Sequence, residues 1–145
     1  MKQYNNRWFL FGYYSNTQHI WNIALDRIEK VDETNEKYTP NNEIDWSEYF
    51  EDIVGVTKPE NVKAENIILH FYGTTGKYIE SKPIHGSQKS KWIDSNTLEV
   101  QLDLIINYEI TQMILSYAEC VKVIKPASLV GIVKDRLQSG VLLYL

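Results

Sequence analysis

The sequence has little of what commonly carries metal chemistry, cross-links or membrane attachment. Its 145 residues include one cysteine, Cys120, so no disulfide can form within the chain. The three histidines are scattered and show no zinc-ligand spacing. No apolar run approaches the roughly 20 residues of a membrane helix, and the amino-terminal residues contain no signal-peptide core. These absences predict a cytoplasmic protein with no membrane contact, no metal and no other cofactor.

Positive charge is also scarce. Fifteen Lys and Arg residues stand against 19 Asp and Glu, which gives a net charge of -4 and excludes a chain-wide nucleic-acid surface. Hydrophobic residues make up 43% of the chain, enough to build a buried core and to argue against disorder. The acidic excess lies in residues 1–60, with 11 acidic and 6 basic side chains, whereas residues 61–145 are nearly balanced.

The change of composition near residue 60 predicts two small modules. Gly55, Lys58 and Pro59 lie at the change, and glycine and proline are frequent at boundaries between packed units. We therefore expect a first module over residues 1–42, a linker with a short helix over 43–60, and a second module over 61–145.

The residue pattern of the first module predicts a β-hairpin. Aromatic and β-branched residues fill 7–14 and 19–25, and the polar turn 15–18 separates them. Side chains alternate along a strand, so both faces of the first strand are apolar. One face carries Trp8, Leu10 and Tyr14, and the other carries Phe9, Phe11 and Tyr13. Such a strand is expected to be central in a small barrel or covered by a partner.

Residues 26–31 either extend the second strand or turn out of it, and the polar segment 32–42 predicts a loop. Apolar residues at three- and four-residue steps then predict a short amphipathic helix over 45–53, with Asp45 as its N-cap.

The residue pattern of the second module predicts alternating strands and helices. Strands are expected at 66–72, 88–93, 97–104 and 121–124, and a short helix at 76–82. Asn107 should cap a helix with an apolar stripe, and Pro126 should begin a last helix that ends at Gly140. The order β-α-β-β-α-β plus a helix is the ferredoxin-like pattern, so the fold class is α+β.

Several short motifs resemble one protein family in order and spacing. Arg7–Leu10 and the following Leu25–Ile28 resemble the WYL domain, named for a Trp-Tyr-Leu triplet. Downstream, Pro83–Gln88, Ile114–Tyr117 and Val121–Pro126 resemble the extension that follows WYL domains in many bacterial regulators. The resemblance spans nearly the whole chain.

The resemblance implies a small Sm-like β-barrel for residues 1–42 and a ferredoxin-like extension for 61–145. Relatives carry these parts behind a helix-turn-helix that contacts DNA. We expect this chain to lack that domain and the first barrel strands, so the barrel is partial and DNA is reached only through the absent amino-terminal domain. The implied function is the non-enzymatic, ligand-sensing and dimerisation part of a transcriptional regulator. Unpaired strand edges predict a homodimer formed through residues 7–14.

The resemblance also implies where a nucleic-acid or nucleotide-like effector would bind. Guanidinium groups make paired hydrogen bonds to phosphate, and aromatic rings stack on bases. The candidate ligand-binding residues are Arg7, Phe9, Trp21, Arg27 and His85, and the family-motif or structural residues are Trp8, Leu10, Asp26 and Gln88.

Each candidate also has a structural interpretation. Arg27 could pair with Asp26 or Glu29, the aromatic rings could form the core, and His85 could hold the helix-to-strand connection. Two departures from the family bear on the fold: Phe9 replaces tyrosine and loses its hydroxyl, and Ala118 replaces a glycine that permits a left-handed helix end.

Catalysis finds little support in the sequence. His85 and Ser87 are close in sequence, but no glycine-flanked nucleophile elbow is present. The segment 73–77 lacks the spacing of a phosphate loop. The alternatives to ligand sensing are an oligomerisation module that binds no ligand and positions DNA-binding heads, and, less favoured, a hydrolase using the His85 loop.

Overall fold

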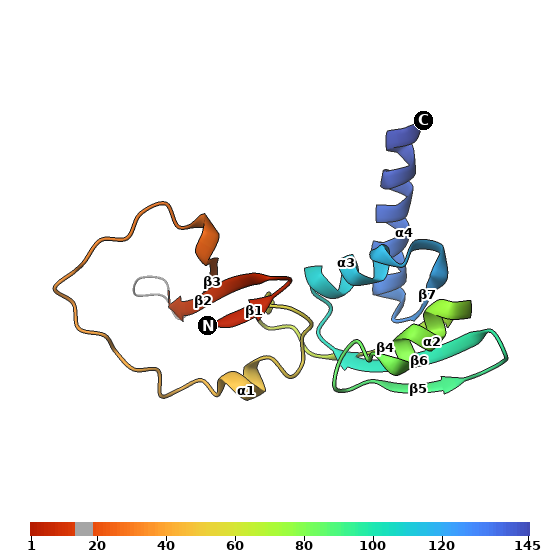
Figure 1. Ribbon diagram of the computed structural model, residues 1–145, viewed down its shortest axis with the longest axis horizontal. Helices are drawn as coiled ribbons and strands as arrows, with labels where there is room; N and C mark the ends of the chain where they lie inside the picture. The colour runs from red at the N-terminus through yellow and green to blue at the C-terminus, as the bar shows by residue number, and fades with distance from the viewer. Residues whose placement is uncertain (14–18) are drawn as a thin grey trace.

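Two antiparallel sheets, one of three strands and one of four, organise this α+β chain (Figure 1). The computed structural model describes residues 1–13 and 19–145. Tyr14 and the expected hairpin turn at 15–18 therefore lie outside the described residues.

The first sheet has the strand order β1-β2-β3, with β1 (Lys2–Tyr4), β2 (Arg7–Tyr13) and β3 (Ile20–Ala24). The predicted pairing of β2 with β3 is confirmed, and β1 is an additional strand that the sequence interpretation missed. Asn5 and Asn6 join β1 to β2 with φ of 46° and 60°. A two-residue hairpin turn with both φ positive favours asparagine. Among the described residues this sheet stays open and does not close into a barrel.

One face of the first sheet packs against α1 (Trp46–Tyr49). The Phe11 ring lies 5.7 Å from the Trp46 ring and 5.1 Å from the Phe50 ring, centroid to centroid. Asp45 is the predicted N-cap, and its carboxylate accepts hydrogen bonds from the backbone N–H groups of the first turn. The helix ends at Tyr49, earlier than the predicted end at residue 53.

The other face of the first sheet is exposed and apolar. Cross-strand pairing places Leu10 opposite Ile23 and Gly12 opposite Trp21. We call this surface the outer face; its residues are Trp8, Leu10, Trp21, Ile23 and Leu25, each 39–49% exposed. Both faces of β2 are thus apolar, as predicted, but only one is covered.

The chain leaves β3 through a 3-10 turn, Leu25–Arg27, so the strand turns away instead of extending. Residues 28–45 then contain no helix or strand, which confirms the loop predicted over 32–42. In Figure 1 this segment forms the wide orange loop beside the first sheet.

The second sheet has the order β5-β6-β4-β7, and every neighbouring pair is antiparallel. Its strands are β4 (Glu65–Tyr72), β5 (Lys89–Trp92), β6 (Thr97–Leu104) and β7 (Val121–Lys125). The helices α2 (Gly73–Ser81), α3 (Tyr108–Ser116) and α4 (Ala127–Val141) lie on one side of this sheet (Figure 1).

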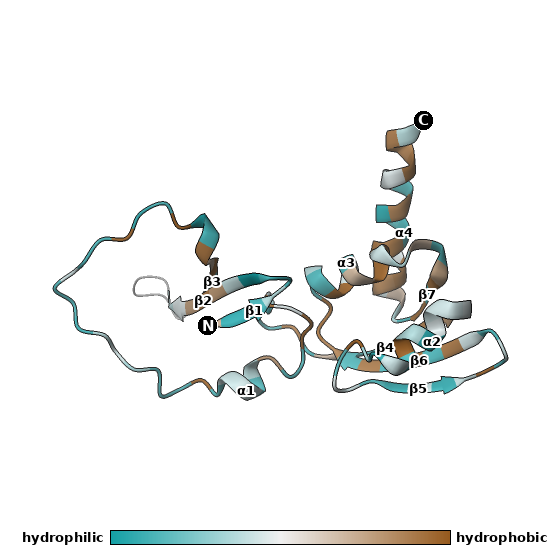
Figure 2. Cartoon of the chain, in the orientation of Figure 1, coloured by the Kyte–Doolittle hydropathy of each residue, from teal (hydrophilic) through white to brown (hydrophobic). Residues whose placement is uncertain are grey.

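The main core lies between the second sheet and these helices, where hydrophobic residues gather along β4 and β6 (Figure 2). Alternate residues of β6 are buried, which confirms the predicted pattern over 97–104. The opposite face is polar: His70 Nε2 lies 3.1 Å from a Glu99 carboxylate oxygen, and Asn66 donates to Asp103. The buried members of the core are Ile67, Leu69, Phe71, Ile79, Leu98, Val100, Leu102, Leu104, Ile110, Ile114, Val123 and Leu129.

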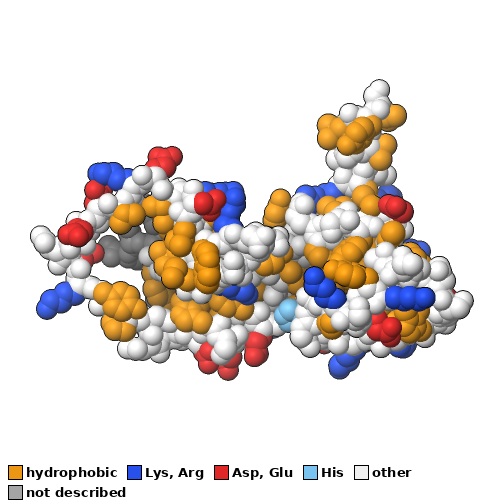
Figure 3. Space-filling model, viewed as in Figure 1, with side chains coloured by type: hydrophobic (Ala, Val, Ile, Leu, Met, Phe, Trp, Pro, Cys, Tyr) orange, Lys and Arg blue, Asp and Glu red, His pale blue; other side chains and the backbone are white. Residues whose placement is uncertain are grey.

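The helix ends agree with the sequence only in part. Asn107 caps α3, as predicted, and Ala118 has the left-handed φ of 44° that the comparison with glycine anticipated. Gly140 does not end the last helix, which runs to Val141 and continues as the 3-10 turn Leu142–Tyr144. This end projects from the body with exposed apolar side chains (Figure 3). None of the helices in the described ranges is long and apolar enough to cross a membrane.

Residues 52–58, hereafter the bracket segment, join the two sheets. Asn107 Nδ2 donates to the carbonyl oxygens of Val54 and Thr57, each at 2.8 Å. On the other side, Asn22 in β3 donates to the Val56 carbonyl at 2.7 Å. Ile53 and Val56 are buried, so this half of the expected linker is packed between the sheets.

Gly55 is required at its position in the bracket segment. Its φ is +86°, and a Cβ there would lie 2.5 Å from Glu109 Cγ. Only glycine combines this left-handed backbone with the missing side chain. The close approach brings the Glu109 carboxylate to the backbone of the bracket segment.

Candidate functional site

A hollow of about 380 Å³ lies where the first sheet meets the bracket segment and the start of α3. We call it the arginine hollow. It contains three of the five candidate ligand residues, Arg7, Phe9 and Arg27. Its full lining is Tyr4, Asn5, Arg7, Phe9, Asn22, Arg27, Val56, Thr57, Tyr108 and Glu109.

The two arginines reach the hollow from different elements. Arg7 begins β2 directly after the Asn5-Asn6 turn, and Arg27 ends the 3-10 turn after β3. Arg7 pairs with Asp26 at 3.1 Å, whereas Arg27 makes no hydrogen bond or ion pair with any other described residue. Because an exposed ion pair contributes little to stability, Arg7 can exchange Asp26 for a ligand oxygen at small cost.

Glu109 supplies a buried carboxylate to the same hollow. It is 8% exposed, and its Oε1 accepts hydrogen bonds from the Val56 and Thr57 backbone N–H groups and from the Thr57 hydroxyl. Its Oε2 is enclosed and receives no hydrogen bond from the described residues. The hollow therefore combines guanidinium donors with a carboxylate acceptor.

Burial and the charge of Glu109 act on two neighbours of the hollow. Burial lowers the pKa of Lys2, and the negative charge of Glu109 opposes this shift. Burial raises the pKa of Tyr4, and here the Glu109 charge acts in the same direction. Lys2 Nζ also lies 3.8 Å from the centroid of the Phe50 ring. The Lys2 ammonium therefore contacts an aromatic ring and is stabilised by the negative charge of Glu109.

Trp21 is not brought into the arginine hollow. It lines a separate hollow of about 290 Å³ that includes Phe11, Tyr49 and Lys58. The strand alternation explains the separation, because Trp21 lies opposite Gly12 whereas Phe9 lies on the other face of β2.

His85 lies in the connection between α2 and β5, outside the arginine hollow. Its Nδ1 accepts a hydrogen bond from the Ser87 backbone N–H at 3.1 Å and lies 3.0 Å from the Ser87 hydroxyl. Burial lowers the pKa of His85, with a further contribution from Lys2. Gln88 accepts from the Ile84 N–H and donates to the Ile79 carbonyl. These contacts all serve the helix-to-strand connection.

The remaining family-motif residues lie outside the arginine hollow. Trp8 and Leu10 are on the outer face, and Asp26 pairs with Arg7.

Over residues 1–13 and 19–145, no three His, Cys, Asp or Glu side chains are grouped to hold a metal ion.

The sequence interpretation missed the far wall of the arginine hollow. Thr57 belongs to the bracket segment, and Tyr108 and Glu109 lie more than 50 positions further along the chain, where Glu109 is hydrogen-bonded to that segment. A glutamate in the first turn of a helix is expected on general electrostatic grounds, so Glu109 gives no separate signal in the sequence.

No protein-family model matches the chain, and no curated protein sequence matches it.

Proposed function

We propose that the chain is the ligand-sensing and dimerisation part of a bacterial helix-turn-helix transcriptional regulator. The Arg7–Leu10 and Leu25–Ile28 motifs support a WYL domain, and the three-stranded sheet fits part of its Sm-like barrel. The antiparallel order β5-β6-β4-β7 and the helices on one side support a ferredoxin-like extension over 61–145. In this proposal the protein is cytoplasmic and catalyses no reaction.

The observation that carries the proposal is the convergence of Arg7, Phe9 and Arg27 on one hollow. Arg27 is free to make two parallel hydrogen bonds to a phosphate, and the half-buried Phe9 ring offers an apolar surface to a base. Glu109 favours a ligand that also carries amino or hydroxyl donors. A nucleotide or a short single strand has all three kinds of group, so this class of ligand fits better than a simple anion.

A ligand here could act on the rest of the molecule through the bracket segment. Val56 and Thr57 line the hollow and are hydrogen-bonded to Glu109 at the start of α3. A ligand shifts the equilibrium between two conformations of a regulator only if it binds one conformation more tightly than the other. We propose that the two conformations differ in how the bracket segment sits against α3.

The test is binding of short single-stranded DNA, short RNA and cyclic nucleotides at low and moderate salt. We expect affinity to fall as salt rises, because phosphate contacts release counterions. Arg27→Ala should weaken binding about 10-fold, the effect of losing a charge-assisted hydrogen bond. Lys77→Ala is the control, since it removes one exposed positive charge outside the hollow. Binding that is equally weakened in both variants, or absent from the wild-type chain, contradicts the sensing role.

The alternative function, an oligomerisation module without a ligand, is favoured by the outer face. Four large apolar side chains are exposed together on two paired strands and a fifth, Leu25, lies in the turn that follows, and such patches mark protein interfaces. In this alternative a second copy of the chain covers the outer face, and the paired modules set the spacing of DNA-binding heads.

Sedimentation velocity tests this pairing. The wild-type chain should dimerise as its concentration rises, and Leu10→Lys should shift the equilibrium to monomer by at least about 10-fold, because a charge would be buried in the contact. Val62→Lys is the matched control, since Val62 and Leu10 are both 43% exposed. A wild-type chain that stays a compact monomer at every concentration would rule out the dimer.

A further inference from the structure

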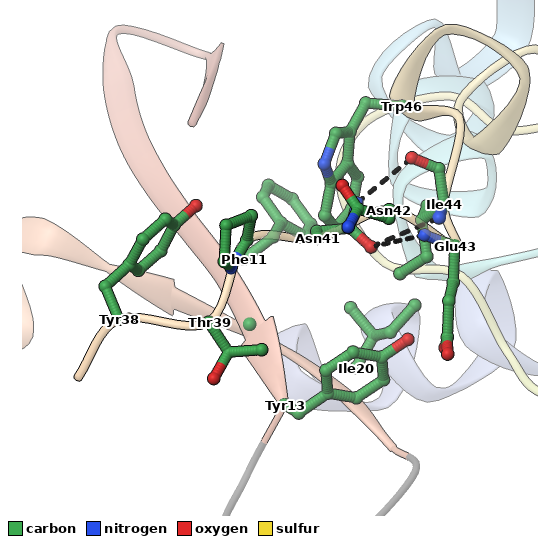
Figure 4. Close-up of a pocket in the computed structure, with 12 residues that line it drawn as sticks. Phe11, Tyr13, Ile20, Tyr38, Thr39, Asn41, Asn42, Glu43, Ile44 and Trp46 are labelled. Carbon is green, nitrogen blue, oxygen red and sulfur yellow. Dashed lines mark hydrogen bonds between the residues drawn. The ribbon is translucent and has the colours of Figure 1, made fainter. Parts of the chain in front are cut away.

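A further hollow, of about 440 Å³, lies between the first sheet and the loop that precedes α1 (Figure 4). It is separate from the arginine hollow, and the proposed function does not use it. We call it the aromatic hollow. Its lining is Phe11, Gly12, Tyr13, Ile20, Tyr38, Thr39, Pro40, Asn41, Asn42, Glu43, Ile44 and Trp46.

Four aromatic rings contribute to this hollow from three segments: Phe11 and Tyr13 from β2, Tyr38 from the loop, and Trp46 from α1. Figure 4 shows these rings arranged around the hollow. The rings of Phe11 and Trp46 are held by mutual packing and by packing on Phe50. The wall they form is therefore in place before any ligand arrives.

The charge of the lining is entirely negative. Glu43 is the one charged residue among the described lining residues, and neither Lys nor Arg is present. Asn41 holds this part of the loop, because its Oδ1 accepts from the Glu43 and Ile44 backbone N–H groups and its Nδ2 donates to the Ile44 carbonyl. The carboxylate of Glu43 is thus carried by an ordered turn at the rim.

The sequence that forms the loop side of the hollow is also acidic. Residues 28–52 contain nine Asp and Glu and only two Lys, so this side of the hollow favours cations over anions. A phosphate ligand requires positive charge, so this acidic surrounding disfavours it. A bare metal ion is also disfavoured, because hard cations need several oxygen ligands and the lining supplies one carboxylate.

We propose that the aromatic hollow binds an organic ammonium group, in particular a quaternary or methylated one. Such a cation is weakly hydrated, and aromatic faces attract it by cation–π interaction. Two rings that pack against Phe11 and Trp46 outside the hollow already make such contacts within the chain, since Lys2 Nζ lies 3.8 Å from the Phe50 centroid and Lys58 Nζ lies 5.0 Å from that of Tyr49. The volume also falls in the range of small-molecule sites.

Isothermal titration of the full chain with choline and with 3,3-dimethylbutan-1-ol tests the site. The alcohol has the shape of choline with carbon in place of the charged nitrogen. We expect choline to bind about 10-fold more tightly, because only the cation gains the cation–π and carboxylate attractions. Equal affinity for the two compounds, or no saturable heat from choline, would overturn the proposal.

Two variants assign the binding to this hollow. Tyr38→Leu should weaken choline binding about 5-fold and leave the fold unchanged, because the Tyr38 side chain is 86% exposed. Tyr144→Leu, at a 91% exposed tyrosine near the carboxyl end, should have no effect. Glu43→Gln should reduce both the affinity and its dependence on salt. Equal affinities in the Tyr38 and Tyr144 variants would place the binding elsewhere and refute the assignment.

Discussion

Asn107→Ala is expected to lower the free energy of unfolding by about 3 kcal/mol, from one lost helix cap and two lost buried hydrogen bonds at about 1 kcal/mol each. Asn107 is 5% exposed, and its amide serves two structures at once. Its Oδ1 accepts from the Ile110 N–H of α3, and its Nδ2 donates to the Val54 and Thr57 carbonyls of the bracket segment. Alanine leaves all three partners without their hydrogen bonds.

Urea unfolding followed by circular dichroism measures this effect, and Asn107→Asp separates the two roles. Aspartate keeps the oxygen that accepts from the Ile110 N–H, so the helix cap remains. Its second oxygen replaces the Nδ2 donor and faces the Val54 and Thr57 carbonyl oxygens, so the variant should still destabilise the fold. Asn66→Ala is the matched control, because its amide donates to Asp103 on the exposed face and its loss should cost less than about 0.5 kcal/mol. A loss of about 1 kcal/mol or less for Asn107→Ala would mean that the bracket segment does not depend on this amide.

The largest loss from a single truncation is expected for Phe71→Ala, at about 3–5 kcal/mol, the range for removing a fully buried phenylalanine. Phe71 is completely buried in the central strand β4. Its ring meets that of Tyr117 edge to face, with centroids 5.4 Å apart. Alanine would remove this contact and leave a cavity between the second sheet and its helices.

The same urea titration tests this prediction, with Phe71→Leu as the comparison that removes less volume. Leucine fills most of the space and should cost about 1–1.5 kcal/mol. Similar losses for the two variants would show that the site collapses around the smaller side chain, which contradicts the rigid packing inferred for this core.

The second module could be predicted well from sequence because its signals are local. Alternation along 97–104 placed one face of β6 inward, and the polar cap Asn107 marked the start of α3. The errors arose where tertiary packing outweighs local preference. Gly140 lies on an exposed helix where glycine costs only about 1 kcal/mol, so it does not end α4. The short strand β1 was missed because three residues give too little periodicity.

The arginine hollow was only half predictable. The resemblance to the family motifs identified Arg7, Phe9 and Arg27 as candidates. These residues lie close together because β2 pairs with β3, the next strand along the chain. Glu109 joins them through a fold-back of more than 50 residues that no local pattern encodes. The same resemblance groups Trp21 and His85 with the arginines, whereas strand alternation and loop position separate them in the structure.

The bracket segment has a consequence for how the molecule comes apart. Val56 accepts a hydrogen bond from β3 through its carbonyl and donates one to Glu109 through its N–H, so the backbone of a single residue ties one sheet to the helix that covers the other. Unfolding of either sheet therefore removes hydrogen bonds that position the other. Heat should therefore denature both modules in one cooperative step, although their hydrophobic contacts are largely separate.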